Sequence, residues 1–170
     1  MPTGNAGELG HIRLAPFGPS GYGKCGSFEG FCSGGGLAQL AETIGRAYIQ
    51  SGKGDPLFPV PGASAKDVAQ AARGGCICAH EVWRVCGEKL GEGLAVLADL
   101  IDPERIVIGS IYARCEDLLA QPMQNALRRE ALAATAAAVQ VVPAALGESV
   151  GDIAALCAAD YGLEEGRVKK

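Results

Sequence analysis

Apolar residues recur at every third or fourth position through the middle of the chain, which is the spacing of a helix with one buried face. The longest such run predicts a helix over residues 76–100. Its apolar positions are Val82, Cys86, Leu90, Leu94, Leu97 and Ile101, and the acidic residues mostly opposite them are Glu81, Glu88 and Glu92. We therefore expect this helix to form the core, with His80 and Trp83 at its edge or against a neighbouring element.

Two shorter helices are predicted before it. Residues 35–50 carry an apolar face, and Ser51-Gly52 is expected to end that helix. The face consists of Leu37, Leu40, Ala41, Ile44, Ala47 and Tyr48. The second helix is predicted to run from Ser64 to about Arg73, because Ser64 and Asp67 have the spacing of a capping box.

The segment between these two helices contains Pro56, Pro59 and Pro61. Each proline removes a backbone donor and fixes its own φ, so the segment cannot be regular. It is predicted to be an ordered surface loop.

The last third of the chain alternates between strand and helix patterns. Short apolar runs predict strands over residues 105–109 and 139–144, and we expect the first strand to be covered on both faces. Helices are predicted over residues 115–130 and 149–161, with Gly162 ending the latter, while residues 131–138 extend a helix or form a linker. The pattern indicates an α/β fold.

Composition narrows the class of protein. A chain of 170 residues with 48% hydrophobic composition and a net charge of −4 fits one globular domain. Its 15 Lys and Arg residues are dispersed among 19 acids, which disfavours nucleic acid as a partner. No secretory or membrane-spanning segment is apparent, so we expect a cytoplasmic protein with no membrane association. Seven cysteines, an odd number in no tight framework, suggest reduced and mostly buried thiols.

The N-terminal region, residues 1–34, is organised differently from the α/β lobe expected over residues 35–162 and the charged tail over 163–170. Residues 7–36 contain ten glycines together with Glu8, His11 and Glu29. Ionised carboxylates only accept hydrogen bonds, and a polyhydroxylated ligand such as a sugar supplies the donors that they need. The alternative is that both glutamates are solvated loop charges and that His11 is a structural residue.

The strings Asn5-Ala6-Gly7-Glu8-Leu9-Gly10-His11-Ile12 and Gly26-Ser27-Phe28-Glu29-Gly30-Phe31-Cys32-Ser33-Gly34 resemble the ROK family of sugar kinases and sugar-responsive repressors. The resemblance implies that Glu8, His11 and Glu29 contact sugar hydroxyls. It also places Ser20, Tyr22 and Ser27 where the family has three zinc cysteines, so no structural zinc is expected. Cys25 and Cys32 are a weak metal signal, and no metal ligands are assigned.

The turn after the strand at residues 105–109 is the candidate nucleotide site. Ligands of open α/β sheets gather beyond the carboxyl ends of the strands, which makes Gly109 and Ser110 candidates. The ROK family usually has a Gly-Gly-Gly-Val turn there that approaches the adenosine of ATP, and this chain keeps only its first glycine. The alternative is a plain strand-to-helix turn.

The resemblance covers nearly the whole chain and implies the C-terminal lobe of an actin-like ATPase (ribonuclease H-like) fold, with helices packed on a small sheet. Family kinases also carry an Asp-x-Gly-Gly-Thr phosphate loop and an Asn-Asp pair with the catalytic base, neither of which is found here. We therefore expect the C-terminal half of such a protein, incomplete alone.

Three functions follow as hypotheses from the resemblance. The first is the sugar-binding lobe of a kinase that uses ATP with Mg²⁺ to phosphorylate a hexose or an N-acetylhexosamine. The second is a non-enzymatic sugar sensor, and the third is a degenerate domain that only associates with partners. The expected partners are a sugar, ATP, and either a second copy of the chain or a missing N-terminal half.

Overall fold

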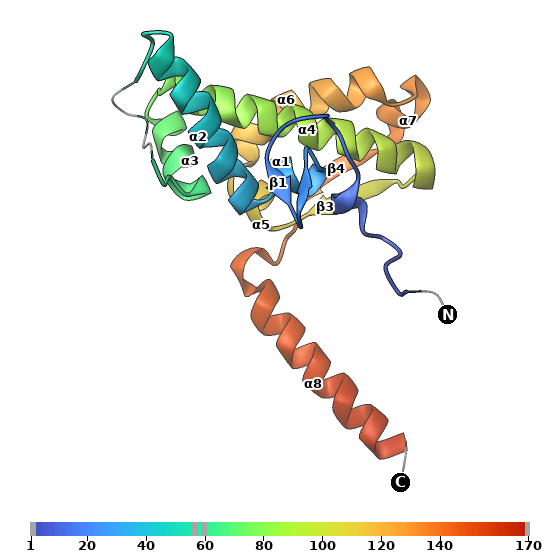
Figure 1. Ribbon diagram of the computed structural model, residues 1–170. Coiled ribbons are helices and arrows are strands. Elements are labelled where there is room, and N and C mark those ends of the chain that lie inside the picture. Colours follow the sequence, from blue (N-terminus) through green and yellow to red (C-terminus); the bar gives the residue numbers. More distant parts are fainter. Residues whose placement is uncertain (1–2, 56–57, 59–60, 169–170) are drawn as a thin grey trace.

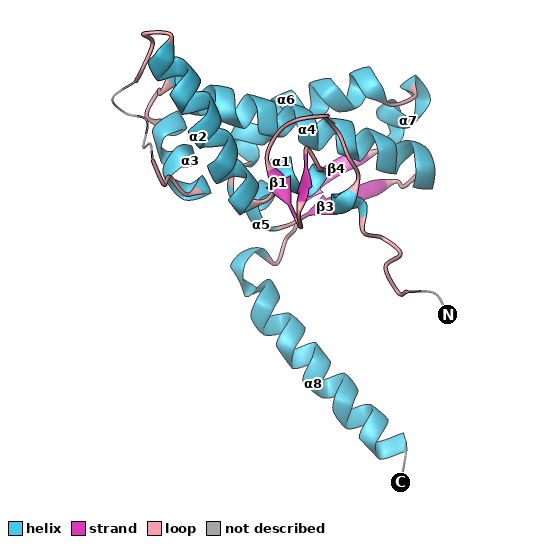
Figure 2. Ribbon diagram, viewed as in Figure 1, coloured by secondary structure: helices cyan, strands magenta, loops and turns pink. Residues whose placement is uncertain are grey.

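The computed structural model describes residues 3–55, 58 and 61–168. Most of the described chain is helical, with two small sheets of two strands each (Figures 1 and 2). In chain order the elements are η1 (Leu9–His11), β1 (Ser20–Gly21), β2 (Lys24–Cys25), α1 (Phe28–Cys32), α2 (Gly34–Gln50), α3 (Ala65–Arg73), α4 (Ile77–Ile101), β3 (Arg105–Ile108), α5 (Ser110–Arg114), α6 (Glu116–Glu130), α7 (Ala133–Ala138), β4 (Gln140–Pro143), η2 (Gly147–Ser149) and α8 (Val150–Val168).

Helix α4 is the centre of the core, as its apolar spacing predicts. Val82, Cys86, Leu90 and Leu94 are buried, and α1, α2, α3 and α6 all pack against the helix. The contact with α6 is close because α4 presents glycines there. A Cβ placed at Gly91 would lie 2.2 Å from the Met123 carbonyl oxygen, so a larger residue would push the helices apart.

Trp83 packs against neighbouring elements in the core, one of its two predicted positions, with 1% of its surface exposed. One prediction about α4 is wrong. Ile101 is 68% exposed, because the helix ends there at Asp102, which takes a left-handed conformation.

Helix α3 begins with the predicted capping box. The Asp67 N–H donates to Ser64 Oγ (3.3 Å), and Ser64 N–H donates to Asp67 Oδ2 (2.9 Å). Helix α2 likewise matches its predicted span and buries Leu37, Leu40 and Ala41. Of the proline loop between these helices, Pro56 and Pro59 lie outside the described residues.

The strands β3 and β4 form a parallel pair, with Ile106 opposite Val141. Ile106 is buried on the helical side, but Val107 is 59% exposed. The prediction that this strand is covered on both faces is therefore wrong for the described chain. The turn after β3 also contains a short helix, α5, where the sequence pattern indicates only a loop.

Helix α8 extends away from the body of the molecule (Figure 1). Its residues from Val150 to Gly162 are exposed. The prediction that Gly162 ends this helix is wrong, since α8 continues to Val168 and includes most of the charged tail. Gly162 is compatible with a helix interior because propensity alone rarely decides a helix end.

Candidate functional site

The glycine-rich region folds into η1, a two-stranded hairpin and α1, and backbone hydrogen bonds fix their arrangement. The Phe28 N–H donates to the Ile12 carbonyl (2.9 Å), and the Gly26 N–H donates to the Pro19 carbonyl (2.9 Å). Gln39 of α2 then ties down the hairpin by accepting from Ser20 N–H (2.9 Å) and donating to the Ser20 carbonyl (3.1 Å). These hydrogen bonds fix η1, the hairpin and α1 relative to one another, and we call this unit the platform.

The structure brings the elements that carry the three sugar candidates together. Glu8 directly precedes η1, His11 ends it, and Glu29 lies in the first turn of α1. The two elements are in contact, because a Cβ at Gly10 would lie 3.4 Å from the Cβ of Glu29. Glu8 and His11 are exposed and Glu29 is half-buried, so the arrangement is an open polar surface.

Three glycines make this packing possible. A Cβ at Gly26 would lie 2.1 Å from the Ala15 carbonyl oxygen, and one at Gly30 would lie 2.3 Å from the Pro19 carbonyl oxygen. At Gly36 the distance to the Gly30 carbonyl oxygen would be 1.7 Å. No side chain fits at these positions, so the glycine content here has a steric cause.

The three residues at the family's zinc-cysteine positions have structural roles of their own. Ser27 is fully buried and caps α1, accepting from Gly30 N–H (3.1 Å) and donating to the Lys24 carbonyl (3.0 Å). Ser20 pairs with Cys25 in the hairpin, and Tyr22 is 83% exposed at its tip with a φ of 45°. Within the described residues, no group of three or more His, Cys, Asp or Glu side chains could hold a metal ion.

The nucleotide candidates Gly109 and Ser110 lie where β3 ends and α5 begins. They line a cavity of about 330 Å³ together with Ala144, which follows the parallel strand β4. Both strands therefore point their carboxyl ends at this cavity, as expected for a ligand site in an α/β sheet. Ser110 has a φ of 54°, a conformation that costs a residue with a side chain about 1–2 kcal/mol.

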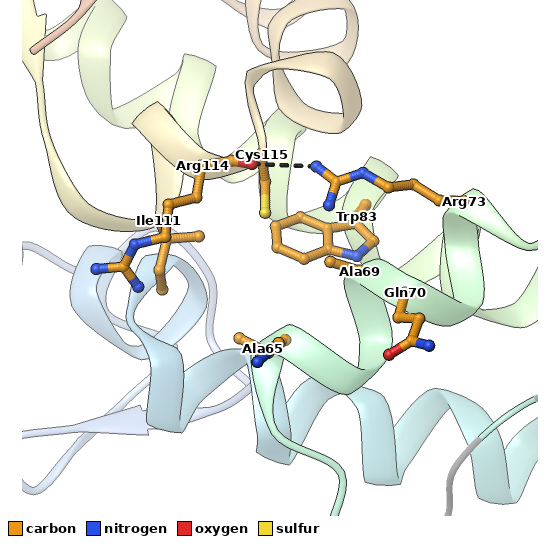
Figure 3. Close-up of a pocket in the computed structure, with 9 residues that line it drawn as sticks. Ala65, Ala69, Gln70, Arg73, Trp83, Ile111, Arg114 and Cys115 are labelled. Atoms are coloured by element: carbon orange, nitrogen blue, oxygen red, sulfur yellow. Dashed lines mark hydrogen bonds between the residues drawn. The ribbon is translucent and has the colours of Figure 1, made fainter. Parts of the chain in front are cut away.

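A second cavity, of about 440 Å³, lies on the other side of α5 and is walled by α3 (Figure 3). Its lining residues are Ala65, Lys66, Ala69, Gln70, Arg73, Trp83, Ile111, Arg114 and Cys115. Arg114 of α5 lines both cavities. Sequence reasoning missed this cavity. The available signal was the spacing of Ala65 and Ala69, two small residues one turn apart on α3.

Arg73 holds the walls of this second cavity together. Its guanidinium donates to both carboxylate oxygens of Asp117 on α6 (2.9 and 2.7 Å) and to the Arg114 carbonyl at the end of α5 (3.0 Å). Figure 3 shows this last bond at the rim. The hydrogen bonds from Arg73 lower the pKa of Asp117, whereas burial raises the pKa of the Cys115 thiol. Cys115 is thus a neutral wall residue.

The architecture defines an α/β lobe of the kind found in sugar kinases, with turns that line a cavity at the carboxyl ends of two parallel strands. The sequence matches the ROK family over residues 2–160, and the chain belongs to this family. No described helix is long and apolar enough to cross a membrane.

Known relatives include kinases and regulators. The chain is 32% identical over 161 residues to a glucokinase of Streptomyces coelicolor, covering 89% of this chain and 50% of the relative. It is 27% identical over 133 residues to the N-acetylglucosamine repressor of Escherichia coli O6:H1, covering 78% of this chain and 32% of the relative. The chain thus spans about half the length of the glucokinase and less of the repressor.

A solved structure agrees with these relatives. A ROK family glucokinase from Streptomyces griseus, crystallised with glucose and AMPPNP, superimposes with a TM-score of 0.70 at 32% identity, covering 86% of this chain and 48% of that chain. The predicted fold class is confirmed. The part played by each candidate site residue stays a prediction.

Proposed function

We propose that this chain is the sugar- and nucleotide-contacting lobe of an ATP-dependent ROK kinase that phosphorylates a hexose or an N-acetylhexosamine. The observation that carries the proposal is that two cavities lie against α5, one at the carboxyl ends of β3 and β4 and the other between α3 and α5. The similarity to a glucokinase crystallised with glucose and AMPPNP supports both ligands.

In this proposal Glu8, His11 and Glu29 bind the sugar. Two carboxylates accept from ring hydroxyls, and a neutral imidazole adds one donor and one acceptor. The exposure of Glu8 and His11 leaves these groups available at the surface of η1. They orient the acceptor hydroxyl, and positioning of this kind supplies several kcal/mol of a transfer barrier.

The nucleotide occupies the space around α5. The apolar floor between α3 and α5 suits a nucleobase, since ligand pockets are predominantly apolar with a few polar groups. The Gly109-Ser110 turn then lies against the rest of the nucleotide. Mg²⁺ enters the site bound to the oxygens of the triphosphate, which are the ligands that it prefers.

Transfer itself needs groups outside these two sites. A base within hydrogen-bond reach of the sugar hydroxyl and donors around the γ-phosphate are required. We assign neither role to Glu8 or Glu29, because the matched family positions bind sugar. We therefore propose that an N-terminal half, matching the part of the glucokinase that this chain does not span, completes the enzyme.

A sugar-sensing regulator is the second candidate. The similarity to the N-acetylglucosamine repressor favours it. A polar surface that binds sugar would equally serve a protein that senses a sugar without turnover. We also propose that the protein is cytoplasmic, that it associates with a second copy or with a partner half, that it makes no direct contact with nucleic acid, and that it binds no zinc. Elemental analysis of the purified chain tests the last, and one tightly held zinc per chain would refute it.

Reconstitution separates the two candidates. The chain is titrated calorimetrically with glucose, N-acetylglucosamine and ATP, and then assayed for sugar phosphorylation after addition of the separately expressed N-terminal half of the S. coelicolor glucokinase. A kinase lobe binds ATP without the added half, and it phosphorylates sugar only when that half is present. A sensor binds sugar but gives no turnover, and binding of neither ligand refutes both.

A variant that fills the cavity between α3 and α5 tests whether ATP binds there. Ala65→Phe places a ring in the space between α3 and α5, whereas Ala134→Phe adds the same ring at an exposed position on α7. Only the first is expected to weaken ATP binding, by tenfold or more. Equal ATP affinity in the two variants would remove the cavity from the nucleotide site.

A further inference from the structure

Trp83 has a polar atom without a partner. Its indole nitrogen is buried and makes no hydrogen bond to any part of the chain that the structure describes. The ring itself is 1% exposed. Leaving a buried donor unsatisfied costs about 1–3 kcal/mol, and native proteins almost always pair such groups. An acceptor from outside the chain would remove this cost.

The ring lies where a ligand could supply that acceptor. Trp83 lines the cavity of about 440 Å³ between α3 and α5. In Figure 3 the nitrogen-bearing edge of the indole faces the side of Ala69 and Gln70. Ala69 presents only a methyl group beside this edge, and the side chain of Gln70 is exposed.

The chemistry of the lining narrows the class of ligand. The floor consists of an aromatic ring and small or aliphatic side chains, which favours a flat, largely apolar group. The cationic side chains of Lys66 and Arg114 line the same space and suit an attached anionic group. A planar heterocycle with an in-plane acceptor and a phosphate chain, in other words a purine nucleotide, has both properties.

We propose that Trp83 reads the nucleobase, with its indole N–H donating to a ring nitrogen of the bound purine. This inference rests on the proposed nucleotide site and adds to it the residue that hydrogen-bonds the base. Trp83 acts here through binding and takes no part in phosphoryl transfer. A site built to donate one hydrogen bond discriminates strongly against a ligand that lacks the acceptor.

The chain offers a direct probe because Trp83 is its only tryptophan. Labelling tryptophan with ¹⁵N gives a single indole resonance, and its proton exchange with solvent is measured with and without saturating ATP. We expect ATP to shift the resonance and to slow exchange at least tenfold. An indole proton that ATP leaves unchanged, in a chain that calorimetry shows to bind ATP, overturns the role of Trp83 and leaves the nucleotide site intact.

Ligand analogues provide a second test that needs no variant. Among the 1-deaza, 3-deaza and 7-deaza forms of ATP, the one lacking the accepting nitrogen is expected to bind about tenfold more weakly. Trp83→Phe should bind ATP and that analogue equally, because the donor is gone. Equal affinities of all three analogues for the native chain contradict the inference.

Two controls separate this role from packing. Met123→Leu alters a fully buried residue of α6 that does not line the cavity, and it should leave ATP affinity unchanged. Gln70→Ala tests whether Gln70 already pairs with the indole in solution: a shift of the indole resonance in the ligand-free variant, with no further change on adding ATP, refutes the proposal. Failure of the native chain to bind ATP refutes both the proposal and the nucleotide site.

Discussion

The two candidate ligand regions are built in opposite ways. The sugar candidates lie on an open surface, where backbone hydrogen bonds fix η1 and α1 but Glu8 and His11 remain exposed. The nucleotide candidates lie beside two cavities that α3, α5 and the ends of β3 and β4 already enclose. Of these two regions, only the second is concave in the part of the chain that the structure describes.

This difference bears on what the chain can do by itself. Small-molecule sites usually bury most of their ligand, so an open surface with two carboxylates would form only one wall of a sugar site. Nucleotide affinity should therefore belong largely to this chain, whereas sugar affinity should rise when a second wall is added. The chain's coverage of about half of the glucokinase is consistent with such a division.

The strongest way to break the platform under the sugar surface is Gly36→Ala. A Cβ there would lie 1.7 Å from the Gly30 carbonyl oxygen, which forces α1 away from α2. We expect a loss of about 3 kcal/mol or more in the free energy of unfolding, measured with urea. Gly35→Ala is the matched control, because no heavy atom lies within 4 Å of its Cβ. Equal stability of the two variants would contradict the packing.

Removing a carboxylate tests the sugar surface itself. Glu29→Ala deletes charge-assisted hydrogen bonds and should weaken sugar binding by about 2 kcal/mol, as should Glu8→Ala. Calorimetry with the preferred sugar measures this change, and ATP affinity should not move. Glu42→Ala removes an acid on α2 that pairs with Arg46, and it serves as the control. If Glu29→Ala and Glu42→Ala bind sugar alike, Glu29 does not belong to the site.

The spacing of apolar residues correctly predicted the helices that pack against other parts of this chain. Helices α2, α3 and α4 have close to their expected spans, since apolar spacing and a capping box are local signals. Trp83 shows the limit of that reasoning. A pattern identifies the centre of a buried face but not its width, which depends on how many helices pack around α4.

Val107 and α8 show a second limit. The apolar strand was predicted to be covered on both faces, yet Val107 is exposed, and α8 is exposed as well from Val150 to Gly162. The cavity at Trp83 was out of reach for another reason, because α3 and α5 are about forty residues apart and nothing local brings them together. The Glu8, His11 and Glu29 assignments were reached through a family motif, and their roles await binding experiments.

Ser110 gives a smaller effect within the nucleotide region. The chain keeps glycine at Gly109, where the φ of −92° suits any residue, and has serine at 110, where φ is 54°. Ser110→Gly should therefore raise the free energy of unfolding by up to about 1 kcal/mol by relieving this strain. Gly109→Ala should change it little, since its Cβ would lie 3.7 Å from that of Ala144. A destabilised Ser110→Gly variant would show that the serine side chain stabilises the turn by more than the strain costs.

The smallest expected effect concerns the cap that starts α3, one wall of the cavity between α3 and α5. Hydrogen bonds from the Ser64 hydroxyl and N–H lower the pKa of Asp67 in the folded chain. A lowered folded pKa stabilises the fold above the unfolded pKa of about 4, and this contribution is lost as the pH falls through the folded pKa. Asp67→Asn has no such proton to bind, so the difference in Tm between the native chain and the variant should shrink from pH 5 to pH 3. A difference in Tm that stays constant over that range would show that the cap contributes no pH-dependent stability. Asp117→Asn should alter the dependence of Tm on pH independently, because Asp117 pairs with Arg73.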